Sequence, residues 1–217
     1  MKLPEKTVER LSEYRRTLLD CLANGKTHIY SHEIAKLHNN TAVQVRRDLM
    51  LIGYSSIKKR GYDAQELIGV IGKLIDHPNG LNVAVIGMGN LGRAITTFFT
   101  GKRAKLNVVA TFDVDENKID KVISGVKCFH IRDFQTIIAQ HDIRIAIITT
   151  PPDTANVISE LLVAAEIKGI LNFTTAQLNV PENVFLEEYN MITSMEKVAY
   201  FVKDIDTKQL ITKMISQ

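Results

Sequence analysis

The stretch VAVIGMGNLGRA, residues 83–94, is the strongest indication of the fold class. The apolar run VAVIG is typical of a buried strand, and LGRAITTFF, which follows it closely, is typical of a helix. The turn between them fits the pattern G-x-G-x-x-G, in which glycines allow a tight turn, a close approach of backbone to pyrophosphate, and close packing of helix on strand. The amides at the start of such a helix attract negative charge. We therefore assign to a dinucleotide site Gly87, Met88, Gly89, Asn90, Leu91 and Gly92.

Further cofactor contacts are expected at the ends of later strands. Asp113 ends the strand NVVATFD, where a carboxylate accepts hydrogen bonds from ribose hydroxyls and repels a 2′-phosphate, so NAD is favoured over NADP. The alternative is that Asp113 is only a turn residue at the strand end. Lys118 lies nearby in the sequence and is included in the site. Ligands of such sheets lie at strand ends, so the site also takes in Thr149, Thr150, Pro151 and Asn172.

The chain after residue 79 alternates between strand and helix patterns. The strands NVAVIG, NVVATFD, IRIAIITT and GILNFT are separated by the helical segments LGRAITTFF, FQTIIAQ and TANVISELLVAAEI. Such alternation predicts a doubly wound parallel sheet with helices on both faces, which is the Rossmann type of α/β fold. We expect this domain to span residues 79–203.

A different pattern occupies residues 1–78. An amphipathic helix is predicted over 5–23, a short helix capped by Ser31 follows, a third runs from Thr41 to about Ile52, and a fourth covers 64–76. The breaking sequence His77-Pro78-Asn79-Gly80 sets the boundary before the glycine motif. Residues 31–49 therefore have the layout of a helix-turn-helix.

The third helix is the candidate reader of DNA. On a helical wheel Ala42, Val45, Leu49 and Ile52 share the core face, whereas Val43, Gln44, Arg47 and Met50 point away and Arg46 and Asp48 lie on the flanks. Arginine suits guanine and glutamine suits adenine in a major groove, and Arg46 is placed for phosphate or a carboxylate. Alternatively, Gln44 only completes a capping box with Thr41. The candidate DNA contacts on this helix are Thr41, Val43, Gln44, Arg46 and Arg47.

The basic segment YSSIKKRGY, residues 54–62, would suit a β-hairpin wing lying over the DNA backbone. Its cations would supply affinity that is independent of base sequence and sensitive to salt. The alternative is a solvated loop. From this segment we assign to DNA binding Lys58, Lys59, Arg60 and Tyr62.

The sequence contains no recognisable catalytic set. Its 217 residues carry a net charge of +3, and the six histidines and two cysteines show no metal spacing, so we expect neither metal nor enzyme activity. We also expect a cytoplasmic location, because unpaired cysteines fit a reducing compartment, and no signal or membrane segment is visible. The rival hypothesis is a small NAD-dependent oxidoreductase whose basic front domain mediates assembly.

Together these motifs resemble the Rex family of bacterial redox-sensing transcriptional repressors. KLPEKTVERLSEYRRTL is similar to that family's opening helix, TAVQVRRDLMLIG to its recognition helix, TFDVDENKI to its ribose-binding strand end, and LLVAAEIKGILNFT to a late stretch. The resemblance implies a winged helix-turn-helix, a homodimer on inverted-repeat double-stranded operator DNA when NADH is low relative to NAD⁺, and release of DNA on NADH binding. It also implies a C-terminal helix, residues 204–217, that is swapped between subunits.

The chain departs from the family pattern at three places. Ser56 and Lys59 stand where the wing usually has glycines, Phe98 where the family often has Tyr, and Asn190 where it often has Asp. In the family an Arg of the opening helix pairs with that Asp of the partner, which makes Arg16, Phe98 and Asn190 the expected switch residues. A neutral Asn and a Phe without a hydroxyl predict weaker contacts in the state that these residues hold.

Overall fold

The protein is described by a computed structural model that covers residues 3–55, 60–99 and 105–215. The chain divides into two compact units, Met1–Asn79 and Gly80–Gln217. The division falls within the breaking sequence His77-Pro78-Asn79-Gly80. Each unit has its own hydrophobic core, and each is described by itself.

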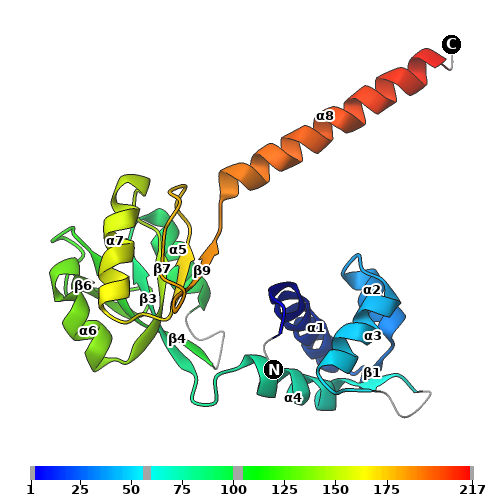
Figure 1. Ribbon diagram of the computed structural model, residues 1–217, viewed down its shortest axis with the longest axis horizontal. Coiled ribbons are helices and arrows are strands. Elements are labelled where there is room, and N and C mark those ends of the chain that lie inside the picture. Colours follow the sequence, from blue (N-terminus) through cyan, green and yellow to red (C-terminus); the bar gives the residue numbers. More distant parts are fainter. Residues whose placement is uncertain (1–2, 56–59, 100–104, 216–217) are drawn as a thin grey trace. The chain divides into compact units, whose positions relative to one another are not determined.

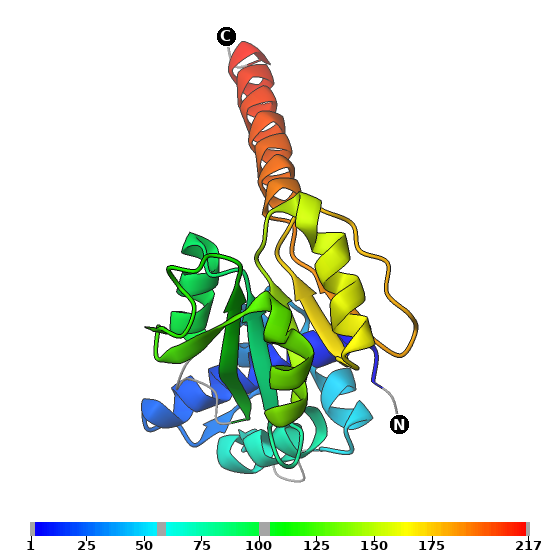
Figure 2. The same ribbon diagram turned by 90° about the vertical axis from the view of Figure 1, so that its left-hand side faces the viewer.

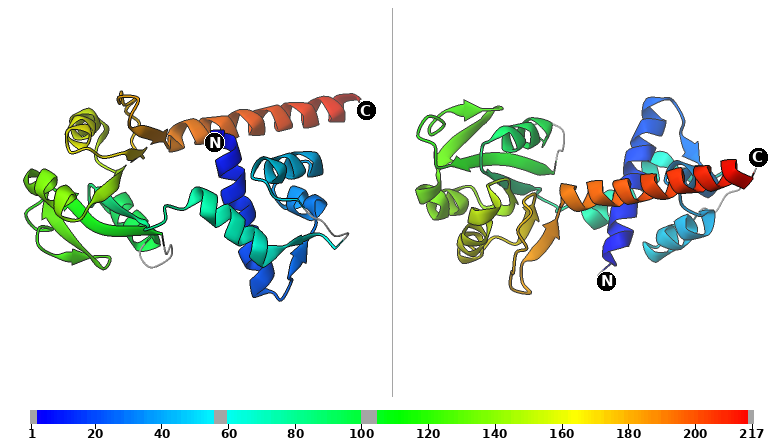
Figure 3. Two further views of the ribbon diagram at one scale, coloured as in Figure 1. Left: turned by 60° about the horizontal axis from the view of Figure 1, so that its bottom comes forward. Right: turned by 90° about the horizontal axis from the view of Figure 1, so that it is seen from above.

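Helices dominate the first unit (Figure 3). Its elements are α1 (Glu5–Ala23), β1 (His28–Ile29), α2 (Ser31–Leu37), α3 (Ala42–Leu51), β2 (Tyr62–Asp63) and α4 (Ala64–Ile75). Helix α1 packs along α4, and α2 packs against α3. Leu11, Tyr14 and Leu18 recur on one face of α1 and are fully buried, which explains why the amphipathic pattern there gave the helix bounds correctly.

Side-chain caps set the starts of α3 and α4. Thr41 Oγ1 accepts a hydrogen bond from Gln44 N at 3.1 Å, and Asp63 Oδ1 accepts one from Glu66 N at 2.8 Å. Ser31 was expected to cap α2, and this is wrong because Ser31 is the first helical residue. Tyr30 occupies the cap position, and its backbone N–H donates instead to the Glu33 carboxylate at 2.8 Å.

The expected wing hairpin spans residues 54–62, of which 56–59 lie outside the described residues, so it stays a prediction. Among the described residues, strand β2 pairs antiparallel with β1, with Ile29 opposite Tyr62. Gly61 has φ of +87°, and a Cβ there would lie 2.8 Å from the Ile29 carbonyl oxygen, so only glycine fits this approach to β1. Lys58 and Lys59 lie outside the described residues.

The second unit contains the predicted sheet (Figures 1 and 2). Its strand order is β5-β6-β4-β3-β7-β8-β9, and all neighbours are parallel except β5 and β6. The strands are β3 (Leu81–Ile86), β4 (Leu106–Asp113), β5 (Val122–Ile123), β6 (Val126–His130), β7 (Ile143–Ile148), β8 (Gly169–Asn172) and β9 (Phe185–Glu188). The helices are α5 (Asn90–Phe99), η1 (Ile131–Asp133), α6 (Phe134–Gln140), α7 (Pro152–Ala164) and α8 (Met191–Ile215).

Alternation along the central strands divides the apolar side chains between two layers. Ala84 and Ile86 of β3 pack with α6 and α7, whereas Val83 and Val85 pack with Ile95 of α5. Helices therefore cover both faces, as predicted for buried parallel strands. The chain enters α5 and α7 directly from the carboxyl ends of β3 and β7, and this brings the glycine turn and Thr149 side by side.

Three parts of this unit differ from the sequence prediction. Strands β5 and β6 lie in a stretch for which no strand was predicted, and β9 adds a further parallel strand beyond β8. Helix α8 begins at Met191, so residues 191–203 are helical, although they were assigned to the Rossmann domain. The described side chains of this helix up to Lys203 are exposed, among them Met195 at 69% and Tyr200 at 67%. The apolar residues of this exposed helix do not form a one-sided stripe, so the sequence carries no amphipathic pattern that would predict its start.

Candidate functional site

A cavity of about 840 Å³ opens where β3, β4 and β7 end. This volume is within the usual range for small-molecule and cofactor sites. Parallel strands place their carboxyl ends at one edge of the sheet, which is where ligands of such folds bind. The cavity is lined by Ile86, Gly87, Gly89, Phe112, Asp113, Val114, Asp115, Lys118, Ile131, Thr149, Thr150, Pro151, Asp153, Thr154, Val157, Ile158 and Leu161.

The glycine turn forms the floor of the cavity. Gly87 has φ of +96°, which side chains rarely adopt, and a Cβ on Gly92 would overlap the Gly87 carbonyl oxygen. Gly89, by contrast, has nothing within 4 Å of an added Cβ, so its open side is free for a ligand to approach the backbone. The three glycines thus have the three roles that the motif predicts for a pyrophosphate site.

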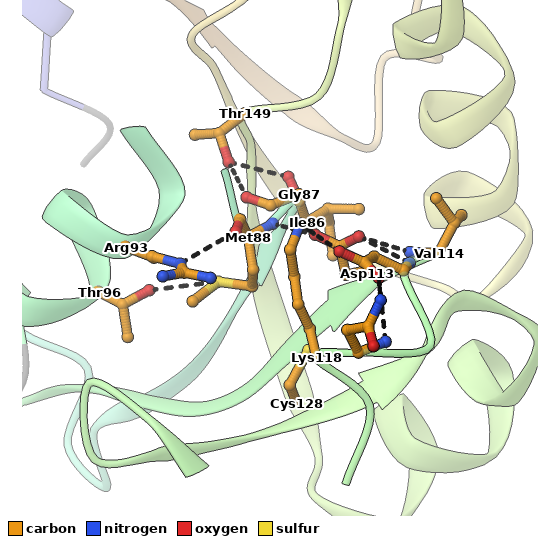
Figure 4. A network of polar contacts seen from close by, with 12 residues as sticks. Ile86, Gly87, Met88, Arg93, Thr96, Asp113, Val114, Lys118, Cys128 and Thr149 are labelled. Carbon is orange, nitrogen blue, oxygen red and sulfur yellow. Dashed lines mark hydrogen bonds and ion pairs between the residues drawn. The ribbon is translucent and has the colours of Figure 1, made fainter. Parts of the chain in front are cut away.

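Thr149, the residue that follows β7, holds this turn in place. Its Oγ1 lies 2.7 Å from the Gly87 carbonyl and 3.0 Å from the Ile86 carbonyl, and its backbone N–H also donates to Ile86 at 2.9 Å (Figure 4). The hydroxyl proton is therefore used inside the protein. Thr149 lines the cavity chiefly as the support that fixes the glycine turn.

Asp113 lies at the centre of the polar network in Figure 4. Its Oδ1 accepts hydrogen bonds from the backbone N–H groups of Val114 at 2.8 Å and Asp115 at 2.9 Å. Its Oδ2 accepts from Met88 N at 2.7 Å and from Lys118 Nζ at 2.9 Å. A carboxylate offers about four lone-pair positions, so these four donors fill it. Three of them are backbone N–H groups, and the fourth is the Lys118 side chain.

The charge of Asp113 follows from these contacts. Burial opposes ionisation, but the hydrogen bonds from Lys118 and from the Asp115 and Met88 amides outweigh it and hold the pKa below its usual value. The group is therefore a fixed anion at neutral pH. A ribose hydroxyl that donates to Asp113 must take the lone pair that Lys118 now holds, because the other three donors are backbone.

An apolar wall and one unpaired hydroxyl complete the cavity. Val157 and Leu161, one turn apart on α7, line it and remain 59% and 38% exposed, although they are large and apolar. Thr150 Oγ1 is buried and has no hydrogen-bond partner among the described residues. A flat apolar ring with polar substituents suits this surface, so the residues present fit a dinucleotide.

The structure sorts the predicted cofactor residues into three groups. The cavity brings together Gly87, Gly89, Asp113, Lys118, Thr149, Thr150 and Pro151. Met88 contributes its amide to Asp113 while its side chain is buried, and Asn90, Leu91 and Gly92 form the start of α5 beside the turn. Asn172 is not among the lining residues: it is fully buried and holds the following turn, with Nδ2 donating to Ala176 and Oδ1 accepting from Thr174.

Sequence reasoning missed the apolar wall. Val114, Ile131, Val157 and Leu161 come from three separate segments, and no spacing links them in the sequence. One signal was available, because Val157 and Leu161 are four residues apart and lie off the face of α7 that carries Ala155 and Ile158 into the core.

The outward face of α3 carries the candidate DNA contacts. Val43 and Met50 are 50% and 69% exposed, and Arg46 and Arg47 are also exposed. Arg46 Nη1 donates to the Ser31 hydroxyl at 3.2 Å, so among the described residues it bonds to a hydroxyl. Arg60 is exposed beside β2.

Two residues that were expected on this face are buried. Asp48 is 2% exposed and lies in the core instead of on a flank of α3. Tyr62 is 8% exposed, and its hydroxyl bonds to Ser31, so it supports the face from inside. The capping box also forms only in part, because Gln44 Nε2 donates to Asp48 and the Thr41 N–H donates to Asn40.

The expected switch residues occupy distinct surroundings. Arg16 on α1 is exposed, and Phe98 on α5 is 58% exposed. Asn190 precedes α8 and caps it, because its Oδ1 accepts from Thr193 N at 3.1 Å. Asn190 therefore has a local role that an Asp could also fill.

Metal sites and membrane-spanning helices are absent from the described part of the chain. No group of three or more His, Cys, Asp or Glu side chains that could hold a metal ion occurs there. Within the same residues, none of the helices combines the length and apolar character that crossing a membrane requires.

Known proteins resemble both units. Residues 2–49 match the family described as "Putative DNA-binding protein N-terminus", and residues 79–176 match the "CoA binding domain" family. The redox-sensing transcriptional repressor Rex of Listeria welshimeri is 31% identical over 95% of this chain and 96% of its own length. The Rex of Bacillus licheniformis is 34% identical over 93% of this chain and 94% of its own.

Solved structures agree with these relatives. The repressor RSP in complex with β-NAD⁺ and operator DNA matches with a TM-score of 0.87 and 29% identity, over 98% of each chain. RSP in complex with β-NADH matches with a TM-score of 0.84 and 28% identity, over 97% of this chain and 99% of that one. These matches confirm the predicted fold class. They also confirm the family resemblance that the sequence motifs indicated.

Proposed function

The chain belongs to the Rex family of redox-sensing transcriptional repressors, and from this we propose that it reports the NADH/NAD⁺ ratio to operator DNA. It binds an inverted-repeat operator when NADH is low and releases it when NADH binds. The observation that carries the proposal is the union, in one chain, of an exposed basic face on α3 and a cavity built on a glycine turn and Asp113. RSP has been solved with both ligand classes.

Two kinds of DNA contact are proposed for the first unit. Arg47 and Gln44 on α3 read base edges in the major groove, with Val43 against a thymine methyl group. Arg46, Lys58, Lys59 and Arg60 meet phosphate, and Thr41 fixes the start of α3 at the backbone. Tyr62 acts from the core, because its ring is buried.

In the second unit the protein holds the cofactor and does not transform it. The amides at the start of α5 hold the pyrophosphate, Asp113 and Lys118 contact the adenosine ribose, and the apolar wall on α7 packs on the adenine. Thr150 and Pro151 line the remaining length, where the unpaired Thr150 hydroxyl meets a polar group. The cofactor supplies a nicotinamide whose oxidation state is the signal.

A homodimer completes the proposed assembly. Helix α8 exposes Met191, Ile192, Met195 and Phe201, each more than half exposed, and such a helix is stable when a second copy covers it. The swapped segment then starts at Met191 and not at residue 204. We place the dimer in the cytoplasm, where operator DNA and the NADH pool meet.

The rival proposal is a small NAD-dependent oxidoreductase. It needs a proton donor or acceptor beside the nicotinamide. Apart from Asp113, Asp115 and Lys118, which belong to the ribose end, the titratable side chain among the cavity-lining residues is Asp153, on the first turn of α7. No histidine, cysteine or tyrosine is among those residues, so we propose that the chain is not an enzyme.

The experiment measures fluorescence anisotropy of labelled duplexes that the full-length protein selects from a random pool. Titrating NADH should release a selected duplex, whereas NAD⁺ at the same concentration should leave it bound. Arg47→Ala should lose roughly 1–3 kcal/mol on selected duplexes and little on random DNA. Equal release by both nucleotides, or turnover of NADH with an added carbonyl substrate, would favour the rival.

The switch is tested in the same assay. Asn190→Asp keeps the cap on α8 and adds a charge, and Asn190→Ser keeps a capping oxygen without one. We expect only the Asp variant to shift the NADH midpoint for release, and Arg16→Ala in that background to cancel the shift, since a charged hydrogen bond exceeds a neutral one. A coupling energy of zero between Arg16 and Asp at this position would remove these residues from the switch.

A further inference from the structure

A buried carboxylate lies behind the exposed face of α3. Asp48 is 2% exposed and accepts four hydrogen bonds from three side chains. Arg10 on α1 donates through Nε to Oδ2 and through Nη2 to Oδ1, both at 2.7 Å. Tyr14 Oη donates to Oδ2 at 3.0 Å, and Gln44 Nε2 donates to Oδ1 at 3.0 Å.

The carboxylate is charged. Burial raises the pKa of Asp48, but the hydrogen bonds from Arg10, Gln44 and Tyr14 lower it by more than burial raises it. The pKa therefore lies below its usual value. An ionised carboxylate only accepts hydrogen bonds. Every group that faces it must therefore be a donor.

This requirement fixes the side-chain amide of Gln44. The amide can face Asp48 only with its NH₂ group, because the carbonyl oxygen would be repelled by the carboxylate. In a planar amide the oxygen points away from the side on which the nitrogen is bound. Asp48 lies on the core side of α3 and Val43 on its exposed side. An amide that donates from Nε2 to Asp48 therefore leaves its oxygen for the exposed side.

We propose that Asp48, held by Arg10, is a positioning residue that sets which hydrogen-bonding group of Gln44 meets the DNA. With the oxygen outward, Gln44 selects a base whose major-groove edge bears an amine, which is adenine N6 or cytosine N4. The inference rests on the proposed function, in which α3 lies in the major groove. It adds that α1 takes part in base selection without touching a base.

A purely structural role for Asp48 makes a different prediction. If the Arg10–Asp48 pair only holds α1 against α3, then weakening it lowers the affinity for all duplexes alike. If Asp48 orients Gln44, then its loss alters the preference at one base pair of each half-site. Base preference at that pair is the readout that separates the two roles.

Asp48→Asn is the informative variant. Its carbonyl oxygen can still accept from Arg10 Nε and Tyr14 Oη at the position of Oδ2, while its NH₂ group takes the place of Oδ1. There the bond from Arg10 Nη2 is lost, which leaves Nη2 donating to Thr7 Oγ1 at 3.2 Å, and the NH₂ group faces Gln44. Gln44 then turns its oxygen inward and presents its NH₂ group to the DNA. The preferred base changes from one with an amine to one with an acceptor, such as guanine O6 or thymine O4.

The test measures the full-length dimer on duplexes that carry each of the four base pairs at every half-site position. We expect the wild type to prefer an amine-bearing base about 5- to 150-fold at one position. Gln44→Ala should lose that preference, Asp48→Asn should reverse it or reduce it below about 3-fold, and the double variant should match Gln44→Ala. Arg15→Gln is the matched control, because Arg15 pairs with Asp76 at 2.7 Å and joins α1 to the segment after α4 instead of to α3.

The outcomes separate this inference from the function on which it rests. Absence of sequence-selective binding by the wild type would defeat the proposed function itself. Selective binding with an unchanged preference in Asp48→Asn would overturn only the role of Asp48. If Asp48→Asn does not fold, side-chain amide exchange of Gln44 in the wild type decides: slowed exchange of one Nε2 proton supports the fixed amide, and fast exchange of both overturns it.

Discussion

Replacing Lys118 with Met removes the ammonium group that lies 2.9 Å from Asp113 Oδ2 and 3.6 Å from Asp115 Oδ2. The three side chains together carry a formal charge of −1 where the adenosine ribose is proposed to bind, and the change makes it −2. A 2′-phosphate there is about 5 Å from the lost cation, which corresponds to roughly 3 kcal/mol per unit charge at an effective dielectric constant near 20. The Lys118 side chain is 21% exposed, so solvent and salt reduce this to about 1–2 kcal/mol.

The expected result is therefore a change in discrimination. The ratio of the NADPH to the NADH dissociation constant should rise about 5- to 30-fold in Lys118→Met. NADH affinity itself should change less, because a ribose hydroxyl gains the lone pair on Asp113 that Lys118 vacates, while the pyrophosphate loses a neighbouring cation.

Calorimetric titration of both nucleotides at two salt concentrations is the assay. Lys127→Met is the matched control, because Lys127 forms an exposed ion pair with Asp120 at 2.9 Å and does not line the cavity. An unchanged ratio of dissociation constants in Lys118→Met, or the same change in the control, would contradict a role for Lys118 in nucleotide discrimination. It would mean that Lys118 leaves Asp113 when ligand binds and plays no part in selecting the nucleotide.

Three further predictions concern Asp113, Gly92 and Asp48. Asp113→Ala should weaken NADH binding by roughly 1.5–3 kcal/mol and NADPH binding less, and equal losses for both in calorimetry would leave Asp113 a turn residue. Gly92→Ala should abolish NADH binding while the helical first unit still melts cooperatively, because the added methyl overlaps the Gly87 carbonyl; retained affinity would show that the turn can open. The pKa of Asp48 is lowered from 3.8, so its stabilisation should be complete above about pH 5 and be lost as the pH falls through the lowered value. Thermal melts at pH 3 to 6 check this, and Asp48→Asn should flatten that acid loss.

The fold class and the course of most elements follow from local patterns in the sequence. Strand–turn–helix around Gly87, strict helical spacing on α1, and caps at Thr41 and Asp63 are local signals, and each acts within a few residues. Such local patterns predict the same helix or strand in any tertiary structure that buries the same face. The same reasoning located Asp113 and Thr150, because the end of a buried strand is visible in the sequence.

Which of these residues act together depends instead on how the helices and strands pack. Asp48 and Tyr62 looked like surface residues of a basic domain, and both are buried. Tyr14 of α1 bonds to Asp48, and Ser31 of α2 bonds to Tyr62. Asn172 ends a strand as Asp113 does, yet its amide is spent on the following turn. Helix α8 carries apolar residues all along its described length and so shows no one-sided pattern. Contacts between residues tens of positions apart, such as Arg10 with Asp48, depend on how helices pack, and no local periodicity encodes the partner.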